Sequence, residues 1–177
     1  MVHEQTAVTD ERARLRLNRY LDCLLRWAPR INLTGAEKRL DAFEMLVLPI
    51  LGAEGLLVAP LIDVGSGNGS PGLILAALRP DLAFTLLEPR AKRWAFLREA
   101  AREMGSANVT VLRERSEAYR GPRAAMVTMR AVGLAPESLR PLLLPGGSVL
   151  VFGGPPLRGA EVIPLRFGSS AQRRCFT

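Results

Sequence analysis

A glycine-rich stretch at residues 61–72 constrains the fold of this chain more than any other segment. It reads Leu-Ile-Asp-Val-Gly-Ser-Gly-Asn-Gly-Ser-Pro-Gly. The apolar run 61–64 is typical of a buried strand. The apolar run 73–78 is typical of a helix, and Pro71 suits its first turn because the missing N–H would have no partner there. The stretch therefore predicts a strand, a glycine loop and a helix in succession.

The loop between the expected strand and helix suits a nucleotide-like ligand. Its alternating glycines permit positive backbone angles and let a ligand reach the main chain. Residues 67–72 also satisfy the dinucleotide fingerprint, which binds pyrophosphate at a helix N-terminus. However, Asp63 at the strand end would crowd a pyrophosphate, whereas it suits the ammonium group of S-adenosylmethionine. We therefore favour that cofactor over a dinucleotide. A glycine turn without any ligand is the simplest alternative.

The rest of the chain after the loop alternates between strand and helix patterns. Further strands are expected at 83–87, 109–112, 125–129 and 148–152, with helices at 90–104 and 135–143. Gly105 is expected to end the first of these helices. This alternation predicts an α/β fold with a doubly wound, mostly parallel Rossmann-like sheet and helices on both faces. The pattern beyond residue 152 is less regular.

Two helical patterns precede the first strand, at residues 9–28 and 40–50. Both carry apolar residues at helical spacing, so we expect an N-terminal helical cap that packs against the sheet. Pro49 is expected to bend or end the second helix. We predict a single domain over 1–177, with 1–58 as the helical extension and 59–177 as the cofactor-binding core.

The charge of the chain favours an anionic partner. The formal net charge is +7, and residues 90–149 carry 11 lysines and arginines against 5 acids. Nucleic acid is the commonest partner for such a surface. Because 22 of the 24 cations are arginine, a GC-rich genome explains the excess equally well. The chain has no membrane-spanning apolar run and no signal-peptide pattern, so we expect a cytoplasmic protein.

The chain offers little for redox or metal chemistry. Cys23 and Cys175 are its only cysteines and His3 its only histidine. Neither a disulfide framework nor a metal site is predicted from so few ligands. We assign no role to His3.

Polar residues follow the expected strands and are candidates for the ligand crevice, which forms at the carboxyl ends of strands in such sheets. Glu88 lies 21 residues after Gly67, a spacing that suits an acceptor for ribose hydroxyls. An exposed strand-end acid is the alternative. Ser116 and Glu117 follow the third strand and could meet an adenine amino group. Arg130 ends the fourth strand, where it would hold a phosphate or a base edge, or pair with Glu117.

Several of these motifs resemble one family, the bacterial methyltransferases of guanine N7 in 16S ribosomal RNA, historically named glucose-inhibited division protein B. The most particular motifs are the Gly-x-Gly-x-Gly-x-Pro-Gly loop and the preceding Asn-Leu-Thr segment at 32–34. The match runs over most of the chain through the segments 20–34, 63–72, 84–88, 92–97, 115–117 and 130–131.

This resemblance implies the cofactor, the site and the reaction. The cofactor is expected to be S-adenosyl-L-methionine, with Gly65 and Ser70 lining its site and Arg130 between cofactor and target base as the catalytic residue. The residues assigned to cofactor binding are Asp63, Gly65, Ser66, Gly67, Gly69, Ser70, Glu88, Ser116, Glu117 and Arg130. The expected partner is 16S ribosomal RNA or the 30S subunit. We expect a monomer that binds neither metal nor membrane.

The chain departs from the family at a few positions. Pro49, Gly52 and Ala53 stand where the family usually has a histidine and an Asp-Ser pair, and Gly153 replaces a common lysine. The segment 172–176 resembles the start of the family's last strand. Three alternatives stay open: a methyltransferase acting on another acceptor, a nicotinamide oxidoreductase, and a non-catalytic RNA-binding protein that retains the cofactor pocket.

Overall fold

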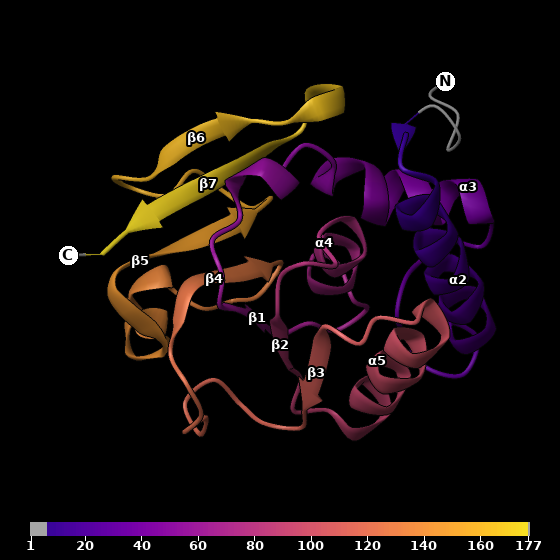
Figure 1. Cartoon of the computed structure of the whole chain (residues 1–177), viewed down its shortest axis with the longest axis horizontal. Coiled ribbons are helices and arrows are strands. Elements are labelled where there is room, and N and C mark those ends of the chain that lie inside the picture. Colours follow the sequence, from indigo (N-terminus) through magenta and orange to yellow (C-terminus); the bar gives the residue numbers. More distant parts are fainter. Residues whose placement is uncertain (1–6, 177) are drawn as a thin grey trace.

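A seven-stranded sheet forms the centre of the computed structural model, which describes residues 7–176 and so leaves His3 outside (Figure 1). The spatial order is β3-β2-β1-β4-β5-β7-β6. The first five of these strands run parallel, whereas β7 is antiparallel to both β5 and β6. The strands are β1 Leu61–Val64, β2 Phe84–Leu87, β3 Val109–Leu112, β4 Ala124–Arg130, β5 Leu143–Phe152, β6 Glu161–Pro164 and β7 Ser170–Cys175.

The parallel part of the sheet confirms the predicted α/β fold. Strand β1 is buried along its whole length, as a central strand covered on both faces should be. Strand β5 begins five residues before the expected 148, because the ladder between β4 and β5 shifts register between Ala124 and Met126. The alternating pattern predicts only the regular part of the strand after that irregularity.

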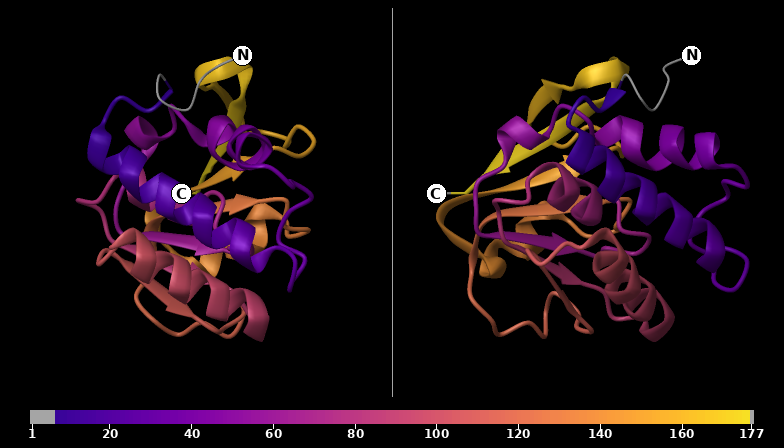
Figure 2. Two further views of the ribbon diagram at one scale, coloured as in Figure 1. Left: turned by 90° about the vertical axis from the view of Figure 1, so that its right-hand side faces the viewer. Right: turned by 45° about the vertical axis from the view of Figure 1, so that its right-hand side comes forward.

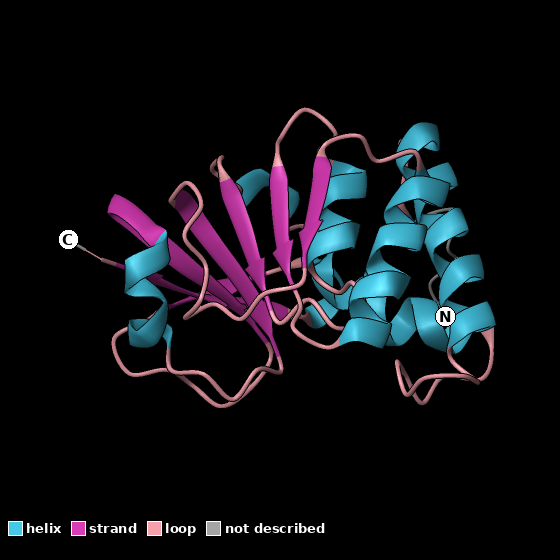
Figure 3. Ribbon diagram, turned by 90° about the horizontal axis from the view of Figure 1, so that it is seen from below, coloured by secondary structure: helices cyan, strands magenta, loops and turns pink. Residues whose placement is uncertain are grey.

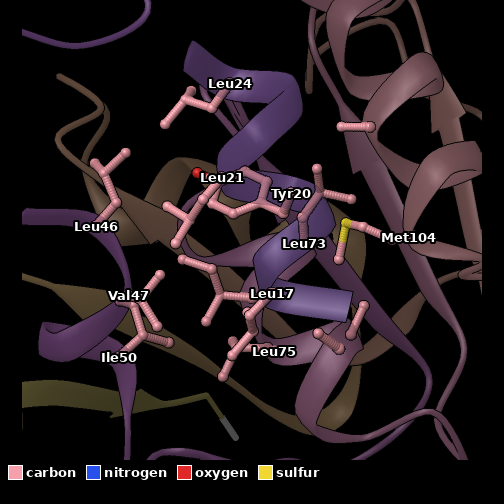
Figure 4. Packing of buried hydrophobic residues seen from close by; sticks show 14 of the residues in the cluster. Leu17, Tyr20, Leu21, Leu24, Leu46, Val47, Ile50, Leu73, Leu75 and Met104 are labelled. Atoms are coloured by element: carbon pink, nitrogen blue, oxygen red, sulfur yellow. The ribbon is translucent and has the colours of Figure 1, made fainter. Parts of the chain in front are cut away.

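Three helices pack on one face of the sheet (Figure 3). They are α2 Glu11–Trp27, α4 Gly72–Leu78 and α5 Ala91–Met104. Helix α2 lies against α5 and also contacts α4 (Figure 2). Its apolar stripe, which includes Leu17, Tyr20, Leu21 and Leu24, points at Leu73 and Leu75 of α4 (Figure 4). No helix within residues 7–176 has the length and apolar character needed to cross a membrane.

The second N-terminal helical segment is not one helix. Instead, α3 Arg39–Ala42 passes into a π-helical turn, η1 Phe43–Val47, and then into a 3₁₀ turn, η2 Leu48–Ile50. Pro49 lacks the N–H that an α-helix would require there, which agrees with the expected break. A further 3₁₀ turn, η3 Glu54–Leu56, leads into β1. The segment α2 to η3 is called the cap below.

The second face of the sheet is covered without a long helix. Its apolar residues, among them Ile62 and Val127, pack against Leu139 and Leu142 of η4 and against Tyr119 in the loop before β4. Segment η4, Pro136–Leu142, is a 3₁₀ helix where an α-helix over 135–143 was expected. Prolines at 136 and 141 explain the error, since Pro141 lies inside the helix and has no N–H to donate.

Strands β6 and β7 form a C-terminal hairpin that gives the sheet an antiparallel edge. Of this hairpin, the sequence predicted only the start of the last strand. A 3₁₀ turn, η5 Arg166–Gly168, joins the two strands. The backbone N–H of Arg166 donates to the carbonyl of Leu51, 3.3 Å away, and so ties the hairpin to the cap.

Gly105 gives a direct test of how α5 ends. It adopts φ +68° at the helix C-terminus, as predicted, and an added Cβ would meet no atom within 4 Å. Replacing it by alanine should therefore lower the free energy of unfolding by about 1 kcal/mol through backbone strain alone. Gly35 is the matched control, because it has equal space but lies outside the left-handed region. Denaturant unfolding that shows no difference between Gly105→Ala and Gly35→Ala would contradict this prediction.

Candidate cofactor site

A cavity of about 210 Å³ opens at the carboxyl ends of the parallel strands. It brings together three of the predicted residues, Gly65 after β1 and Ser116 and Glu117 after β3. Apolar walls come from Val64, Leu87, Pro89, Val132 and Leu134, and Glu114, Arg115 and Gly133 complete the lining. The arrangement is that of a crevice for a flat, partly apolar ligand with a few polar groups.

Gly65 is at the wall of this cavity, where no side chain fits. Its φ is +67°, and an added Cβ would lie 2.8 Å from the Cγ2 atom of Val132. Val132 belongs to the loop after β4, in which Ala131 also has a positive φ of 52°. The loop after β4 therefore closes directly over the glycine loop. Sequence reasoning did not find Val132, because an apolar residue in a loop carries no chemical signal.

Glu88 is buried beside the cavity, with only 3% of its surface exposed. One carboxylate oxygen accepts the N–H of Gly67 at 3.0 Å, and the other accepts the N–H of Arg90 at 2.8 Å. The residue thus joins the end of β2 to the glycine loop. Each oxygen keeps acceptor capacity, so the predicted contact with ribose hydroxyls stays open.

The cap holds the glycine loop from the other side. The hydroxyl of Tyr20, which is fully buried, donates to the carbonyl of Asn68 at 2.8 Å. The Asn68 side chain donates to the carbonyl of Leu33 at 3.1 Å and accepts the N–H of Ser70 at 3.1 Å. Burial raises the pKa of Tyr20 well above its usual range, which keeps the hydroxyl protonated as a donor. Tyr20 was expected only to pack, so this contact was missed.

A side chain of α5 also hydrogen-bonds the backbone of the Asn-Leu-Thr segment. The guanidinium of Arg93 donates to the carbonyl of Asn32 at 3.0 Å, and its Nη1 atom would lie 3.6 Å from a Cβ added to Gly67. The side chains of Asn68 and Arg93 therefore hold the Asn-Leu-Thr segment close to the glycine loop. Asparagine within a glycine loop is itself a sequence signal of such a contact, since its side chain readily hydrogen-bonds the backbone of a turn.

Arg130 connects β4, the glycine loop and the cap. Its Nη1 atom donates to the hydroxyl of Ser70 at 2.6 Å and to the carbonyl of Leu46 at 3.3 Å, and its Nη2 atom donates to the carbonyl of Met45 at 2.7 Å. The Ser70 hydroxyl donates in turn to Leu46, 2.8 Å away. Burial lowers the pKa of Arg130. Arg130 does not pair with Glu117, which was one of the alternatives expected from the sequence.

Asp63 lies beneath α4, apart from the cavity. It is fully buried, and one carboxylate oxygen accepts a hydrogen bond from Thr128 on β4 at 2.6 Å. The other oxygen has no hydrogen-bond partner in the part of the chain that the structure describes, and it would lie 2.6 Å from a Cβ on Gly72. The Ser66 hydroxyl donates to the Asp63 carbonyl at 3.1 Å. Protein encloses the carboxylate in this conformation, so its predicted contact with an ammonium group would require this layer to open.

Burial raises the pKa of Asp63 to about 6, from 3.8 in an exposed aspartate, although the hydrogen bond from Thr128 opposes the rise. The unfolded chain then loses this proton at lower pH than the folded protein does. The contribution of Asp63 to the free energy of unfolding is therefore expected to fall by about 3 kcal/mol as the pH rises from 3.8 to beyond 6.

Asp63→Asn removes this titration. As the pH rises across that interval, the wild type should lose stability relative to the Asp63→Asn variant. Urea unfolding of both proteins at several pH values measures this change. Stability curves that stay parallel from pH 4 to pH 7 would show that the carboxylate is not enclosed as described.

Comparison with solved structures supports the fold. An RNA methyltransferase from Salinibacter ruber, solved in complex with S-adenosyl-L-homocysteine, aligns with a TM-score of 0.51 and 24% sequence identity. The alignment covers 65% of this chain and 78% of the other. At this identity the likeness establishes the Rossmann-like architecture alone.

Sequence relatives are more informative. Ribosomal RNA small subunit methyltransferase G of Neisseria gonorrhoeae is 42% identical over 126 residues, which are 68% of this chain and 59% of the relative. The protein of the same name from Halorhodospira halophila is 40% identical over 144 residues, covering 78% of this chain and 68% of the relative. The chain thus spans about three fifths of the Neisseria relative. A family model described as rRNA small subunit methyltransferase G matches residues 14–158, and the chain belongs to this family, GidB.

Proposed function

We propose that this protein transfers a methyl group from S-adenosyl-L-methionine to N7 of a guanine in 16S ribosomal RNA. The observation that carries the proposal is the meeting of the glycine loop with Ser116 and Glu117 at one cavity, in a chain of the GidB family. Cavities at the carboxyl ends of parallel strands are the usual ligand sites in this architecture.

The lining of the cavity fits the nucleoside part of this cofactor. Leu87, Pro89 and Val132 offer apolar surface to a flat ring, while Ser116 and Glu117 offer acceptors to an exocyclic amino group. The volume of about 210 Å³ is below that of most pockets for complete drug-sized ligands, which agrees with a site for an adenosine portion. Glu88 would accept hydrogen bonds from the ribose, with Ser66, Gly67, Gly69 and Ser70 forming the adjoining loop.

The proposed reaction requires alignment more than proton transfer. The bound cofactor supplies an electrophilic methyl group on a sulfonium, and guanine N7 carries an in-plane lone pair, so no general base is needed. The protein's own contribution is to hold the two reactants in line and to exclude water. Positioning of this kind can lower a barrier by roughly 7–11 kcal/mol.

Arg130 is proposed as the residue between cofactor and target base. Three hydrogen bonds to Ser70, Leu46 and Met45 use part of its five N–H donors, and the remaining donors can meet guanine O6 or a phosphate. In this proposal the guanidinium positions the base while it also holds the cap against the loop.

The partner is proposed to be 16S ribosomal RNA, free or within the 30S subunit, met by a monomer in the cytoplasm. The positive charge of residues 90–149 supports a polyanionic partner. The domain is proposed to comprise the whole chain, with its cap packed on the cofactor-binding core. A methyltransferase acting on another acceptor is the nearest alternative.

A non-catalytic RNA-binding protein is the second candidate, because of the departures from the family pattern. Gly52 stands at one of these positions with φ +98°, and an added Cβ would lie 2.9 Å from the backbone nitrogen of Arg166. A side chain does not fit there without a shift of the hairpin. Cofactor binding without methyl transfer to any ribosomal RNA would identify this case.

The decisive experiment is transfer of labelled methyl groups to deproteinised 16S ribosomal RNA and to 30S particles from a strain that lacks the modification. Glu88→Ala should weaken binding of S-adenosylhomocysteine by at least about tenfold, because it removes an acceptor and frees the Gly67 amide. Arg130→Ala should lower the transfer rate with a smaller effect on that affinity.

Glu37→Ala and Arg30→Ala serve as controls, since both residues are exposed and neither lines the cavity. Equal, negligible effects of Glu88→Ala and Arg130→Ala would contradict the proposed site. Absence of labelled N7-methylguanine with the wild type would contradict the proposed reaction. Tighter binding of NADH than of S-adenosylhomocysteine would instead favour an oxidoreductase.

A further inference from the structure

A second cavity, of about 400 Å³, lies at the outer edge of the sheet between α5 and β3. Figure 1 shows these two elements side by side. We call this cavity the edge pocket. It is lined by Arg98, Ala101, Arg102, Gly105, Ser106, Ala107, Val109 and Val111. None of these residues belongs to the candidate cofactor site.

Two guanidinium groups flank the edge pocket, and within residues 7–176 only one of them, that of Arg102, has a carboxylate within 4.0 Å. Arg98 and Arg102 are four residues apart on α5, so they share one face of the helix and repel each other. Arg98 lies over the ring of Trp94 at 4.9 Å, and within residues 7–176 no carboxylate pairs with it. The acid nearest Arg102 is Glu103 at 3.9 Å, but both oxygens of Glu103 already accept from Arg26 at 2.6 Å.

Ser106 supplies the second, independent observation. The residue is 6% exposed, and its buried hydroxyl oxygen has no hydrogen-bond partner among residues 7–176. Its backbone N–H donates to the carbonyl of Ala101 at 3.0 Å, and that of Gly105 donates to Arg102 at 3.1 Å. These bonds satisfy carbonyls of the last helical turn. The negative end of the α5 dipole opposes a bound anion there, so the two guanidinium groups must outweigh it. A buried hydroxyl without a partner is unusual enough to suggest a missing ligand atom.

We propose that the edge pocket binds a phosphate group of an RNA strand. Arg98 and Arg102 would contact the phosphate oxygens, which suit the planar donor pattern of guanidinium groups. Ser106 would donate its hydroxyl after a rotation of its side chain, because that oxygen is buried in this conformation. Val109 and Val111 provide an apolar floor for the adjoining sugar or base. The volume is in the range of sites that hold a nucleotide-sized ligand.

The edge pocket lies along β3, where Val109 and Val111 line it, and the cofactor cavity begins beyond the end of that strand. The loop after Leu112 contributes Ser116 and Glu117 to the cofactor cavity. Four residues of strand span roughly 13 Å, so one extended RNA strand could reach both. The inference rests on the proposed function, because it identifies a second contact for the same ribosomal RNA.

The test is equilibrium binding of 16S ribosomal RNA over a range of salt concentrations. Arg98→Gln/Arg102→Gln should weaken binding about tenfold or more and should reduce the slope of log affinity against log salt by about 0.7 for one lost phosphate contact. Ser106→Ala should weaken binding several-fold. It should not lower thermal stability, because alanine removes the hydroxyl that has no partner.

The matched control is Arg12→Gln/Arg16→Gln on α2, which removes the same two charges at the same spacing. Equal losses from the two double variants would mean general attraction of a polyanion and would overturn the edge pocket, as would unchanged binding by Ser106→Ala. Displacement of RNA by polyglutamate as readily as by polyphosphate would also overturn the assignment to phosphate.

Failure of the inference can be separated from failure of the proposed function. If the wild type binds and methylates ribosomal RNA while the edge variants do so equally well, only the edge pocket is disproved. If the wild type neither binds nor methylates it, both proposals are wrong.

Discussion

The glycine loop between β1 and α4 depends on hydrogen bonds from other parts of the chain. Glycines at 65, 67 and 69 offer no side chains with which to fix their own conformation, and each has a positive φ. Glycine also loses more conformational freedom on folding than other residues. Glu88 therefore binds the loop from the sheet, while Tyr20 binds it from the cap. The shape of the candidate cofactor site is a property of these contacts as much as of the loop sequence.

This dependence gives the cap a role beyond covering the sheet. The apolar stripe of α2 fixes Tyr20 within the core, so the hydroxyl reaches the loop from a rigid position. The π-helical turn η1 offers the carbonyls of Met45 and Leu46 to Arg130 and Ser70. Single π-helical turns are frequent at functional sites. Each bond contributes about 1 kcal/mol, but together they join three separate segments at the end of the sheet.

The sequence predicted regular elements better than the contacts between them. Strands β1 to β4 and helix α5 were predicted nearly to the residue, because burial and helical periodicity leave strong patterns, whereas β5 begins five residues earlier than expected. The cap segment at 40–50 is helical and breaks at Pro49 as expected, but its π-helical turn was not predicted. The α-helix expected at 135–143 was wrong, since prolines at 136 and 141 turn that segment away from α-helical hydrogen bonding. Of the hairpin, only the start of β7 was expected, because its short strands contain proline and charge in place of clear alternation.

The site was likewise predicted well where residues follow regular strands and poorly where contacts between segments decide. Gly65, Ser116 and Glu117 meet at the cavity, because strand ends share one edge of a parallel sheet. Asp63 and Arg130 were harder to interpret, since a residue's position at a strand end does not determine where its side chain points. Tyr20 and Asn68 were not identified because their roles depend on contacts between segments 48 residues apart.

Hydrogen–deuterium exchange in the glycine loop tests most directly whether the cap holds it. Tyr20→Phe keeps the buried ring and removes only the hydroxyl that donates to Asn68. Amides of residues 65–70 are expected to exchange faster in this variant than in the wild type, while amides of β5 remain equally protected. Equal exchange of the loop amides in both proteins would contradict this account.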